Sequence, residues 1–407
     1  MATQTLSPTA PLALESRALV PGPAAITAMV IALAAWYLST AISWRQGALF
    51  LVGAAAGVVL YHAAFGFTSS WRVFISDRRG AGLRAQMLML ALTCAVFFPL
   101  LAAGSFLGQP LRGSVSPAGV GVAAGAFIFG LGMQLGGGCA SGTLFSVGGG
   151  STRMLVTLLF FIIGSVIGTA HTPWWNARPA FPATSIVTTM GPWLGLAVCF
   201  ALFGGIAWFT RVAERQRHGR IVDETRPARG PRWLKGPWPL VAGAAGLAAV
   251  NIATLTIGGR PWGVTSAFAL WGAKLFAALG IDVASWAYWT TPAQATALRS
   301  SVLMDVTSVM DFGIILGALM AAILAGRFAP VWKVSGRSLA AAVIGGILLG
   351  YGARIAYGCN IGAYFSGIAS GSLHGWLWLV AAFAGNIAGT GLRPMFDLNV
   401  EKTQTAC

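Results

Sequence analysis

Ten apolar stretches, each long enough to cross a lipid bilayer, alternate with short polar segments along the chain. A membrane-spanning α-helix needs about 20 predominantly apolar residues. The stretches cover residues 24–43, 47–64, 84–107, 117–135, 153–171, 189–210, 237–257, 308–328, 338–356 and 373–391. The stretch 262–280 is also apolar, but Gly263, Gly272 and Lys274 interrupt it, so we expect it to insert only partly. The pattern predicts an all-α polytopic membrane protein with about ten transmembrane helices.

The positive charges lie in a few loops between these stretches. Only 9% of the 407 residues are charged, whereas a soluble domain carries about 25%. Four arginines lie between Arg72 and Arg84, and eight Lys/Arg lie between Arg211 and Lys235. If the N-terminus is cytoplasmic, both loops and the Arg327–Arg337 loop fall inside, as the positive-inside rule requires. The net charge of +16 thus reflects orientation in a bacterial inner membrane with cytoplasmic termini, and no nucleic-acid partner is expected.

The second half of the chain repeats the first. Residues Gly130–Ser146 (GLGMQLGGGCASGTLFS) and Gly350–Ser366 (GYGARIAYGCNIGAYFS) are identical at 7 of 17 positions. A weaker pair, Gly66–Ser69 (GFTS) and Gly263–Ser266 (GVTS), occurs in the same order. The order predicts a tandem duplication. Because five spans, an odd number, separate each motif from its counterpart, we expect two inverted pseudo-symmetric repeats.

This duplication predicts how the chain is organised. The predicted units are a polar N-terminal tail (1–23), a first transmembrane repeat (24–210), a basic cytoplasmic linker (211–236), a second transmembrane repeat (237–394) and a C-terminal tail (395–407). The first tail lacks the apolar core of a signal peptide and is not expected to be cleaved.

Each repeat carries two glycine-rich breaks, and a short second helix is expected after each. The breaks are Gly66–Ser69, Gly136–Gly142, Gly263–Ser266 and Gly358–Gly362. Non-helical backbone at membrane depth is tolerated only where protein buries it or where it lines a cavity. We therefore expect four re-entrant hairpins to meet at mid-membrane, where the N–H groups of the short helices favour an anion.

Two cysteines occupy equivalent turns of the duplicated motif. A lone cysteine in an apolar span is usually a small packing residue, and Cys94 and Cys199 are read in that way. Cys139 and Cys359 recur at the tips of the stronger pair of breaks, which favours a functional role. Each thiol is either a weak S–H donor to a sulfur atom or, with a depressed pKa, a nucleophile.

Other candidates surround the two thiols. Arg354 and its counterpart Gln134 lie within spans, where a charge indicates function or a side chain that reaches the membrane surface. Serines and threonines at the breaks are donors to an oxyanion or helix caps. The candidate substrate-binding residues are Gly66, Thr68, Gln134, Gly138, Cys139, Ser141, Gly142, Gly263, Thr265, Arg354, Gly358, Cys359, Asn360 and Gly362.

Several kinds of chemistry are not expected. The four histidines are scattered and no CxxC pair occurs, so neither a metal site nor a cofactor is predicted. Among carboxylates only Asp311 lies at the edge of a span, so a buried carboxylate proton relay is not expected. These features favour a transporter over an enzyme.

The glycine–cysteine motifs resemble those of a known family. Tyr351–Asn386 (YGARIAYGCNIGAYFSGIASGSLHGWLWLVAAFAGN) and Leu135–Ser151 (LGGGCASGTLFSVGGGS) resemble the YeeE/YedE family of sulfur-transport membrane proteins. The resemblance covers about Leu51 to Pro394. It implies thiosulfate uptake through pseudo-symmetric halves, in which thiols at the hairpin tips pass the anion inward by transient S–H···S contacts.

One position departs from the family pattern. Relatives usually carry a third cysteine in a context like FCFTSAFR, but here the stretch reads FGFTSSWR, with Gly66 in its place. The resemblance therefore implies a permease for thiosulfate or a closely related sulfur anion. A selenium oxyanion, linked to the YedE branch, stays open. So does persulfide transfer, in which Cys139 or Cys359 becomes covalently sulfurated. The resemblance also implies a TusA-like sulfur-carrier protein as a cytoplasmic partner.

Overall fold

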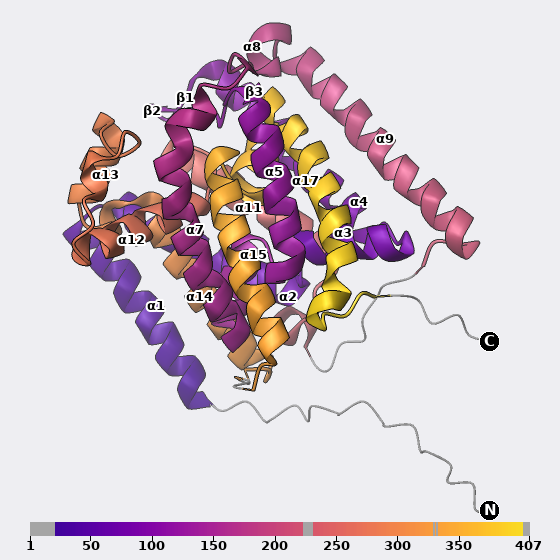
Figure 1. Cartoon of the computed structure of the whole chain (residues 1–407), viewed down its shortest axis with the longest axis horizontal. Coiled ribbons are helices and arrows are strands. Elements are labelled where there is room, and N and C mark those ends of the chain that lie inside the picture. Colours follow the sequence, from indigo (N-terminus) through magenta and orange to yellow (C-terminus); the bar gives the residue numbers. More distant parts are fainter. Residues whose placement is uncertain (1–20, 223–230, 329, 331–332, 402–407) are drawn as a thin grey trace, which may run out of the picture.

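The computed structural model describes residues 21–222, 231–328, 330 and 333–401, and nearly all of them that adopt regular structure are helical (Figure 1). Within these residues ten segments are long and apolar enough to cross a membrane, which confirms the predicted number. The helices that contribute to them are α1 (Pro21–Ala41), α2 (Trp44–Ala63), α3 (Phe67–Asp77), α4 (Ala81–Ala103), α5 (Val120–Gly136), α6 (Ala140–Gly148), α7 (Thr152–Asn176), α9 (Pro192–His218), α11 (Leu240–Gly258), α14 (Val306–Leu324), α15 (Gly336–Ile355), η3 (Asn360–Phe365), α16 (Ser366–Ala369), α17 (Leu373–Leu392) and η4 (Arg393–Phe396).

The remaining elements are short and lie in the connections between these segments. They are α8 (Ile186–Met190), α10 (Arg232–Lys235), α12 (Thr265–Ala278), η1 (Val283–Ser285), α13 (Pro292–Arg299) and η2 (Val302–Met304), with strands β1 (Ser105–Phe106), β2 (Gln109–Pro110), β3 (Ala118–Gly119) and β4 (Ala180–Phe181). The strands form two antiparallel pairs, β1 with β2 and β3 with β4. The α12 helix is too short to span, in agreement with the partial insertion expected for 262–280.

The ends of the predicted domains differ in part from the helices. The α9 helix continues to His218, so it includes the first residues of the linker predicted at 211–236. Three of its last residues, Arg215, Arg217 and His218, lie where basic side chains interact favourably with the helix dipole. Residues 1–20, 223–230 and 402–407 lie outside the described residues. They include most of the predicted N-terminal tail, the last six residues of the predicted C-terminal tail and part of the predicted linker.

Four helices break at the predicted glycine-rich motifs, and a shorter helix follows each break. The pairs are α2–α3, α5–α6, α11–α12 and α15–η3/α16. Gly66 is the N-cap of α3, Cys139 that of α6 and Cys359 that of η3. The η3 segment is a turn of π-helix, a form that is frequent at functional sites.

Small residues bring the central helices together. Gly53 and Gly57 of α2 face the backbone of α14, and Gly345 of α15 faces Gly136 of α5, so closely that an added Cβ would collide with backbone atoms. Lipid is as apolar as leucine, so helices in a bilayer associate mainly through such close van der Waals packing. The glycines of the chain therefore permit close helix packing as well as the breaks in the helices.

The contacts in one half have counterparts in the other. The α5–α17 contact corresponds to α15–α7, α2–α14 to α11–α4, and α3–α17 to α12–α7. This correspondence supports the predicted duplication. The inverted two-fold relation between the halves stays a prediction.

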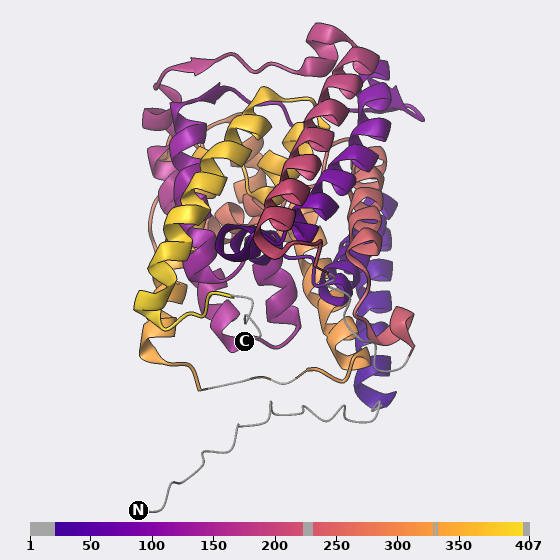
Figure 2. The same ribbon diagram turned by 90° about the vertical axis from the view of Figure 1, so that its right-hand side faces the viewer.

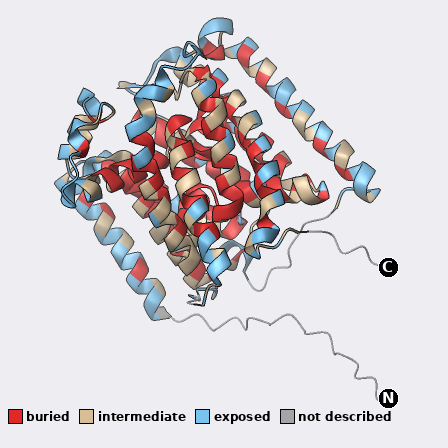
Figure 3. Cartoon of the chain, in the orientation of Figure 1, coloured by how far each residue is buried: buried red, intermediate tan, exposed pale blue. Residues whose placement is uncertain are grey.

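Two long helices lie at the edges of the bundle and present apolar surface outward. In Figure 3 much of α1 and α9 is exposed, whereas the helices between them are largely buried. Trp36 on α1 and Trp193 and Trp208 on α9 are each more than 60% exposed, which suits contact with lipid. Figure 2 shows the start of α1 and the end of α17 on one side of the bundle, and α8 on the other.

The close α2–α14 contact gives a testable prediction. In Gly317→Ala the new methyl group would collide with the backbone oxygen of Ala54, and we expect a loss of about 1–3 kcal/mol of stability. The matched control is Gly205→Ala on α9, where an added Cβ meets no described heavy atom within 4 Å. This control should be neutral or stabilised by up to about 1 kcal/mol. Melting temperatures of the detergent-purified proteins provide the comparison, and equal values for both variants would contradict the packing argument.

Candidate functional site

Each of the two predicted thiols caps the start of a short helix inside the bundle. The Cys139 Sγ accepts a hydrogen bond from the Gly142 backbone N–H at 3.4 Å and lies 3.4 Å from the Ser141 Oγ. The Cys359 Sγ accepts from the Ile361 N–H, also at 3.4 Å. Both cysteines are buried. The structure therefore gives the two positions of the repeat the same local role.

The turns that present the thiols depend on glycine. Gly137 has φ +90° and Gly358 has φ +148°, values that L side chains rarely adopt. Tyr357, just before Gly358, also has a positive φ of 59°. A Cβ on Gly138 would approach the backbone of Gly142 at 3.2 Å. These constraints explain why glycine surrounds both cysteines in the repeated motif.

The two thiol hairpins meet in the interior. The first consists of α5 and α6 with Cys139, and the second of α15 and η3/α16 with Cys359. The α6 helix contacts η3, and Cys139 and Cys359 are the N-caps of these two helices. Residues separated by 220 positions in the sequence thus become neighbours. This arrangement brings together the two residues on which the functional prediction rests.

Glycines leave open space beside the thiols. A Cβ on Gly142 would meet only the Cys139 Sγ, at 3.4 Å, and one on Gly362 only the Gly263 Cα, at 4.0 Å. A Cβ on Gly263 would meet no described heavy atom within 4 Å. Asn360 follows Cys359 in the same turn, and both polar atoms of its amide are buried without a hydrogen-bond partner among the described residues. Because buried polar atoms are normally paired, this amide marks a place for a polar ligand or water.

The first break lies against the end of α5. The Gln134 Nε2 donates to the Thr68 carbonyl oxygen at 3.2 Å and to the Asn386 Oδ1 at 2.6 Å. The Thr68 hydroxyl is buried and has no partner among the described residues. Gly66 has φ −100°, an ordinary value, and its added Cβ would collide only with the Ser69 hydroxyl. Gly66, Thr68 and Gln134 therefore form a second group of predicted residues.

Arg354 and Thr265 are placed differently from these groups. The Arg354 guanidinium lies over the Tyr288 ring, 5.4 Å from its centre, in the segment that follows α12. It does not join its counterpart Gln134. Thr265 is the first residue of α12 and is buried. Lys274, another charged residue in the partly inserted stretch, donates to the Leu298 and Ser300 carbonyl oxygens, both at 2.6 Å, and thus holds the loop in place.

One buried amide that sequence reasoning missed ties the third break to the second thiol hairpin. The Asn251 Oδ1 accepts from the Trp262 N–H at 2.9 Å, and its Nδ2 donates to the Ser366 Oγ at 3.1 Å. The Ser366 hydroxyl in turn donates to the Trp262 carbonyl oxygen at 2.7 Å, so it satisfies backbone rather than an oxyanion. A lone asparagine within an apolar run is the signal that could have revealed this link.

Asp311 lies in the second turn of α14, near the start of this span, and is fully buried. The helix begins at Val306, after the N-cap Asp305, whose Oδ2 accepts from the Ser308 N–H at 2.8 Å. Neither Asp311 carboxyl oxygen has a described hydrogen-bond partner, and the residue interacts electrostatically with Cys359. A buried carboxyl near the thiols is therefore present.

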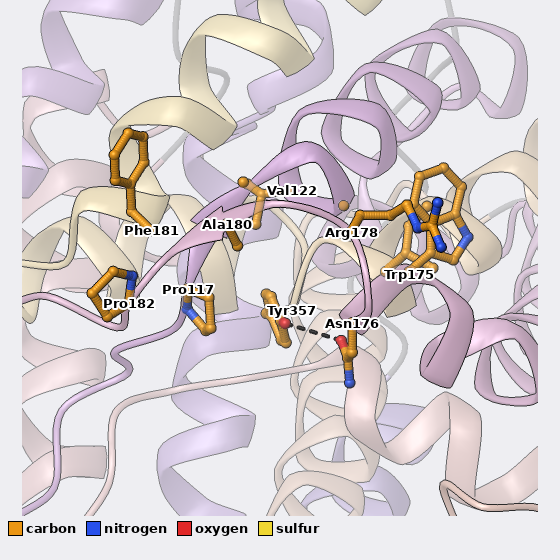
Figure 4. A pocket seen from close by; sticks show the side chains of 12 residues that line it. Pro117, Val122, Trp175, Asn176, Arg178, Ala180, Phe181, Pro182 and Tyr357 are labelled. Atoms are coloured by element: carbon orange, nitrogen blue, oxygen red, sulfur yellow. Dashed lines mark hydrogen bonds between the residues drawn. The ribbon is translucent and has the colours of Figure 1, made fainter.

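A surface pocket opens above the second thiol hairpin. It has a cavity volume of about 230 Å³, and Asn176, Arg178, Ile355 and Tyr357 are among the residues that line it. In Figure 4 the Tyr357 hydroxyl points to Asn176, with 3.1 Å between its oxygen and the Asn176 Oδ1. Tyr357 precedes Cys359 by two residues, but Cys359 itself is buried and is not among the residues that line the pocket.

The broken helices and their interior hairpins define a multi-pass membrane protein of the transporter class, not an enzyme. The chain belongs to the sulphur transport family, whose profile matches residues 62–388. This match confirms the resemblance seen in the sequence.

Individual relatives agree with the family match. The chain is 28% identical over 356 residues to thiosulfate transporter TsuA of Spirochaeta thermophila. The matched region covers 83% of this chain and 95% of that protein. It is 25% identical to thiosulfate transporter TsuA of Escherichia coli, over 82% of this chain and 91% of that protein. It is 31% identical to probable transporter YedE of Escherichia coli, over 42% of each chain.

The unpaired Asp311 carboxyl gives a prediction about stability. A buried charge without a partner costs more than a buried neutral amide, so Asp311→Asn, which keeps the size but cannot ionise, should melt at the same or a higher temperature. The control is Asp305→Ala on the same helix, which removes a cap and should cost about 1 kcal/mol. Thermal melting in detergent provides the comparison. If Asp311→Asn lowers the melting temperature as much as Asp305→Ala does, the Asp311 carboxyl group stabilises the fold, and no functional role is needed to explain it.

Proposed function

We propose that this protein is a permease that carries thiosulfate, or a closely related small sulfur-containing anion, across the bacterial inner membrane through the space between the two thiol hairpins. The observation that carries the proposal is the pair of buried thiols, Cys139 and Cys359, at equivalent helix starts beside glycine-lined space. The names of the two full-length TsuA relatives support thiosulfate as the cargo.

The hydrogen bonds of the thiols suit a soft sulfur atom. Each Sγ already accepts a backbone N–H, from Gly142 or Ile361, so its own S–H is directed to another acceptor. A thiol is a weak donor, and a terminal sulfur is a polarisable acceptor of matching strength. The oxygens of the anion would be bound by the Asn360 amide, which lacks a described partner. Neutral donors of this kind would hold the anion without trapping it.

Orientation and partner belong to the same proposal. The loops that contain Arg72–Arg84 and Arg327–Arg337 would face the cytoplasm, as would both termini. The pocket at Tyr357 would then open outward. A small TusA-like sulfur carrier would dock on the basic loops and receive the cargo.

The first functional prediction concerns the thiols. Cys139→Ala and Cys359→Ala should each abolish most uptake of labelled thiosulfate into proteoliposomes, because the S–H donor is lost. The side-chain volume removed is small, so stability should fall by only about 1 kcal/mol. The controls are Cys94→Ala and Cys199→Ala, which are equally buried but lie outside the breaks, and these should transport normally.

Three results would count against this proposal. Equal behaviour of all four alanine variants would show that the thiols are not the reason for the motif. A stable mass increase of one sulfur atom on Cys139 or Cys359 after exposure to thiosulfate would favour persulfide transfer over non-covalent passage. Uptake of selenite in preference to thiosulfate would redirect the cargo to a selenium oxyanion.

The second functional prediction concerns the missing thiol at Gly66. The backbone there has φ −100° and the only collision of a new Cβ is with the rotatable Ser69 hydroxyl, so Gly66→Cys should fold. Wild type should discriminate weakly between thiosulfate and competing sulfate, sulfite or selenite, and Gly66→Cys should sharpen the selectivity. Gly66→Ser provides the matched control, because it adds a side chain of similar shape without a thiol. If the wild type already rejects all three competitors and Gly66→Cys changes nothing, two thiols are sufficient for selectivity and the relay argument is wrong.

A further inference from the structure

The segment after α17 folds back over the side of the bundle that carries the basic loops, and its Glu401 binds Arg72 of α3. The Arg72 Nε and Nη2 donate to the two carboxylate oxygens of Glu401 at 2.6 and 2.5 Å. The Ser76 hydroxyl, one helical turn further, donates to the Glu401 carbonyl oxygen at 2.9 Å. This is a two-point contact between a planar guanidinium and a carboxylate, which is the strongest form of such a pair.

Arg72, on α3, lies against the end of α5, the helix that leads to Cys139. Its side chain is only 10% exposed, and its Nη1 points to the Gln134 Oε1 at 3.4 Å. Gln134 belongs to the last two turns of α5, and Cys139 follows five residues later. Thr68, whose unpaired hydroxyl belongs to the first break, is one helical turn before Arg72 on α3. The guanidinium therefore lies between the first break and the end of α5, the helix that leads to Cys139.

Two further arginines lie close by but are engaged with backbone. The Arg393 Nη1 donates to the Gln134 carbonyl oxygen at 2.6 Å. Arg153 donates to the carbonyl oxygens of Gly136 and Leu135 at 2.7 and 2.6 Å. Arg393 interacts electrostatically with Arg72, Arg153 and Glu401. Arg72 and Arg393 are thus the two guanidinium groups close to the Glu401 carboxylate among the described residues, and the Nε–Nη2 edge of Arg72 is the one directed at it.

The charge balance of this cluster requires an anion at Arg72. Burial raises the pKa of the Glu401 carboxyl, but the hydrogen bonds and charge of Arg72 outweigh that effect and hold the pKa below its usual range. Glu401 is therefore ionised at neutral pH. Without it, a largely buried guanidinium would face the like charge of Arg393 with no counterion, which is unfavourable. Another small oxyanion that presents two oxygens to the same edge meets the same need.

We infer that the Nε–Nη2 edge of Arg72 is a binding site for a small oxyanion on the basic-loop side of the pathway, and that the chain's own Glu401 carboxylate occupies it until the transported anion displaces it. The inference rests on the proposed function for the identity of the anion, although the site itself does not. The carboxylate of Glu401 thus serves as an internal competitor. Passage of an anion past Arg72 releases the C-terminal segment, and departure of the anion lets Glu401 return.

The test measures binding of sulfate to the detergent-purified protein by isothermal titration, with chloride added to equal ionic strength. Glu401→Gln removes the competing charge at constant size and should raise the affinity for sulfate several-fold. The matched control is Asp397→Asn, which removes a carboxylate of the same segment that pairs with the exposed Arg337 and changes the net charge equally. This control should bind sulfate as wild type does.

A second variant assigns the binding to Arg72. In the Glu401→Gln background, Arg72→Lys keeps the positive charge but loses the two-point edge, so the gain in affinity should disappear. The proposal is overturned if Glu401→Gln binds no more tightly than Asp397→Asn, or if the gain persists with Arg72→Lys. Should the double variant fail to fold, the comparison of the two single variants decides.

The result is independent of transport. The same titration in a Cys139→Ala background should give the same gain on Glu401→Gln, because the thiol lies outside the Arg72 site. Absence of thiosulfate uptake in every protein would overturn the proposed function and leave this site in place. Normal uptake with no change in sulfate binding would overturn the site alone.

Discussion

Backbone that leaves the helical conformation inside a membrane must find its hydrogen-bond partners within the protein, because hydrocarbon offers none. The rest of this structure depends on that constraint. At one break, Asn251 and Ser366 bind the N–H and carbonyl of Trp262. At the end of α5, Arg153 and Arg393 bind the carbonyl oxygens that a helix end leaves unpaired. Because these side chains satisfy the interrupted backbone, the hairpins can end inside the bundle rather than at its surface.

Close packing of the helices sets how near the hairpins approach each other. Gly345 lies against Gly136, and Gly53 against the backbone of Met310, so α5 meets α15 and α2 meets α14 with little side chain between them. The short helices α6 and η3 then come into contact. The thiols at their starts become neighbours for this reason, and larger residues at the glycine positions would separate them.

The distribution of polar groups changes from the centre to the basic side. Around Cys139 and Cys359 the nearby donors are neutral, namely thiols, backbone N–H groups and the Asn360 amide. Toward the end of α5 the donors are guanidinium groups, with Glu401 bound to Arg72. An anion at the centre would be held weakly by neutral donors. It would then reach the positively charged Arg72, which is already paired with Glu401. Weak binding at several sites in succession is what permits passage.

The sequence by itself determined the ten spans, the four breaks, the duplication and the two cysteines at its equivalent turns. These features are local in the chain, since span length, glycine turns and repeated motifs are read from neighbouring residues. Only the tertiary structure decided that Asp311 is buried, because its burial depends on the helices packed around α14. It also decided the pairing of Arg72 with Glu401, which lie 329 positions apart. Such contacts between distant segments leave no local pattern, because they arise only when the helices are packed.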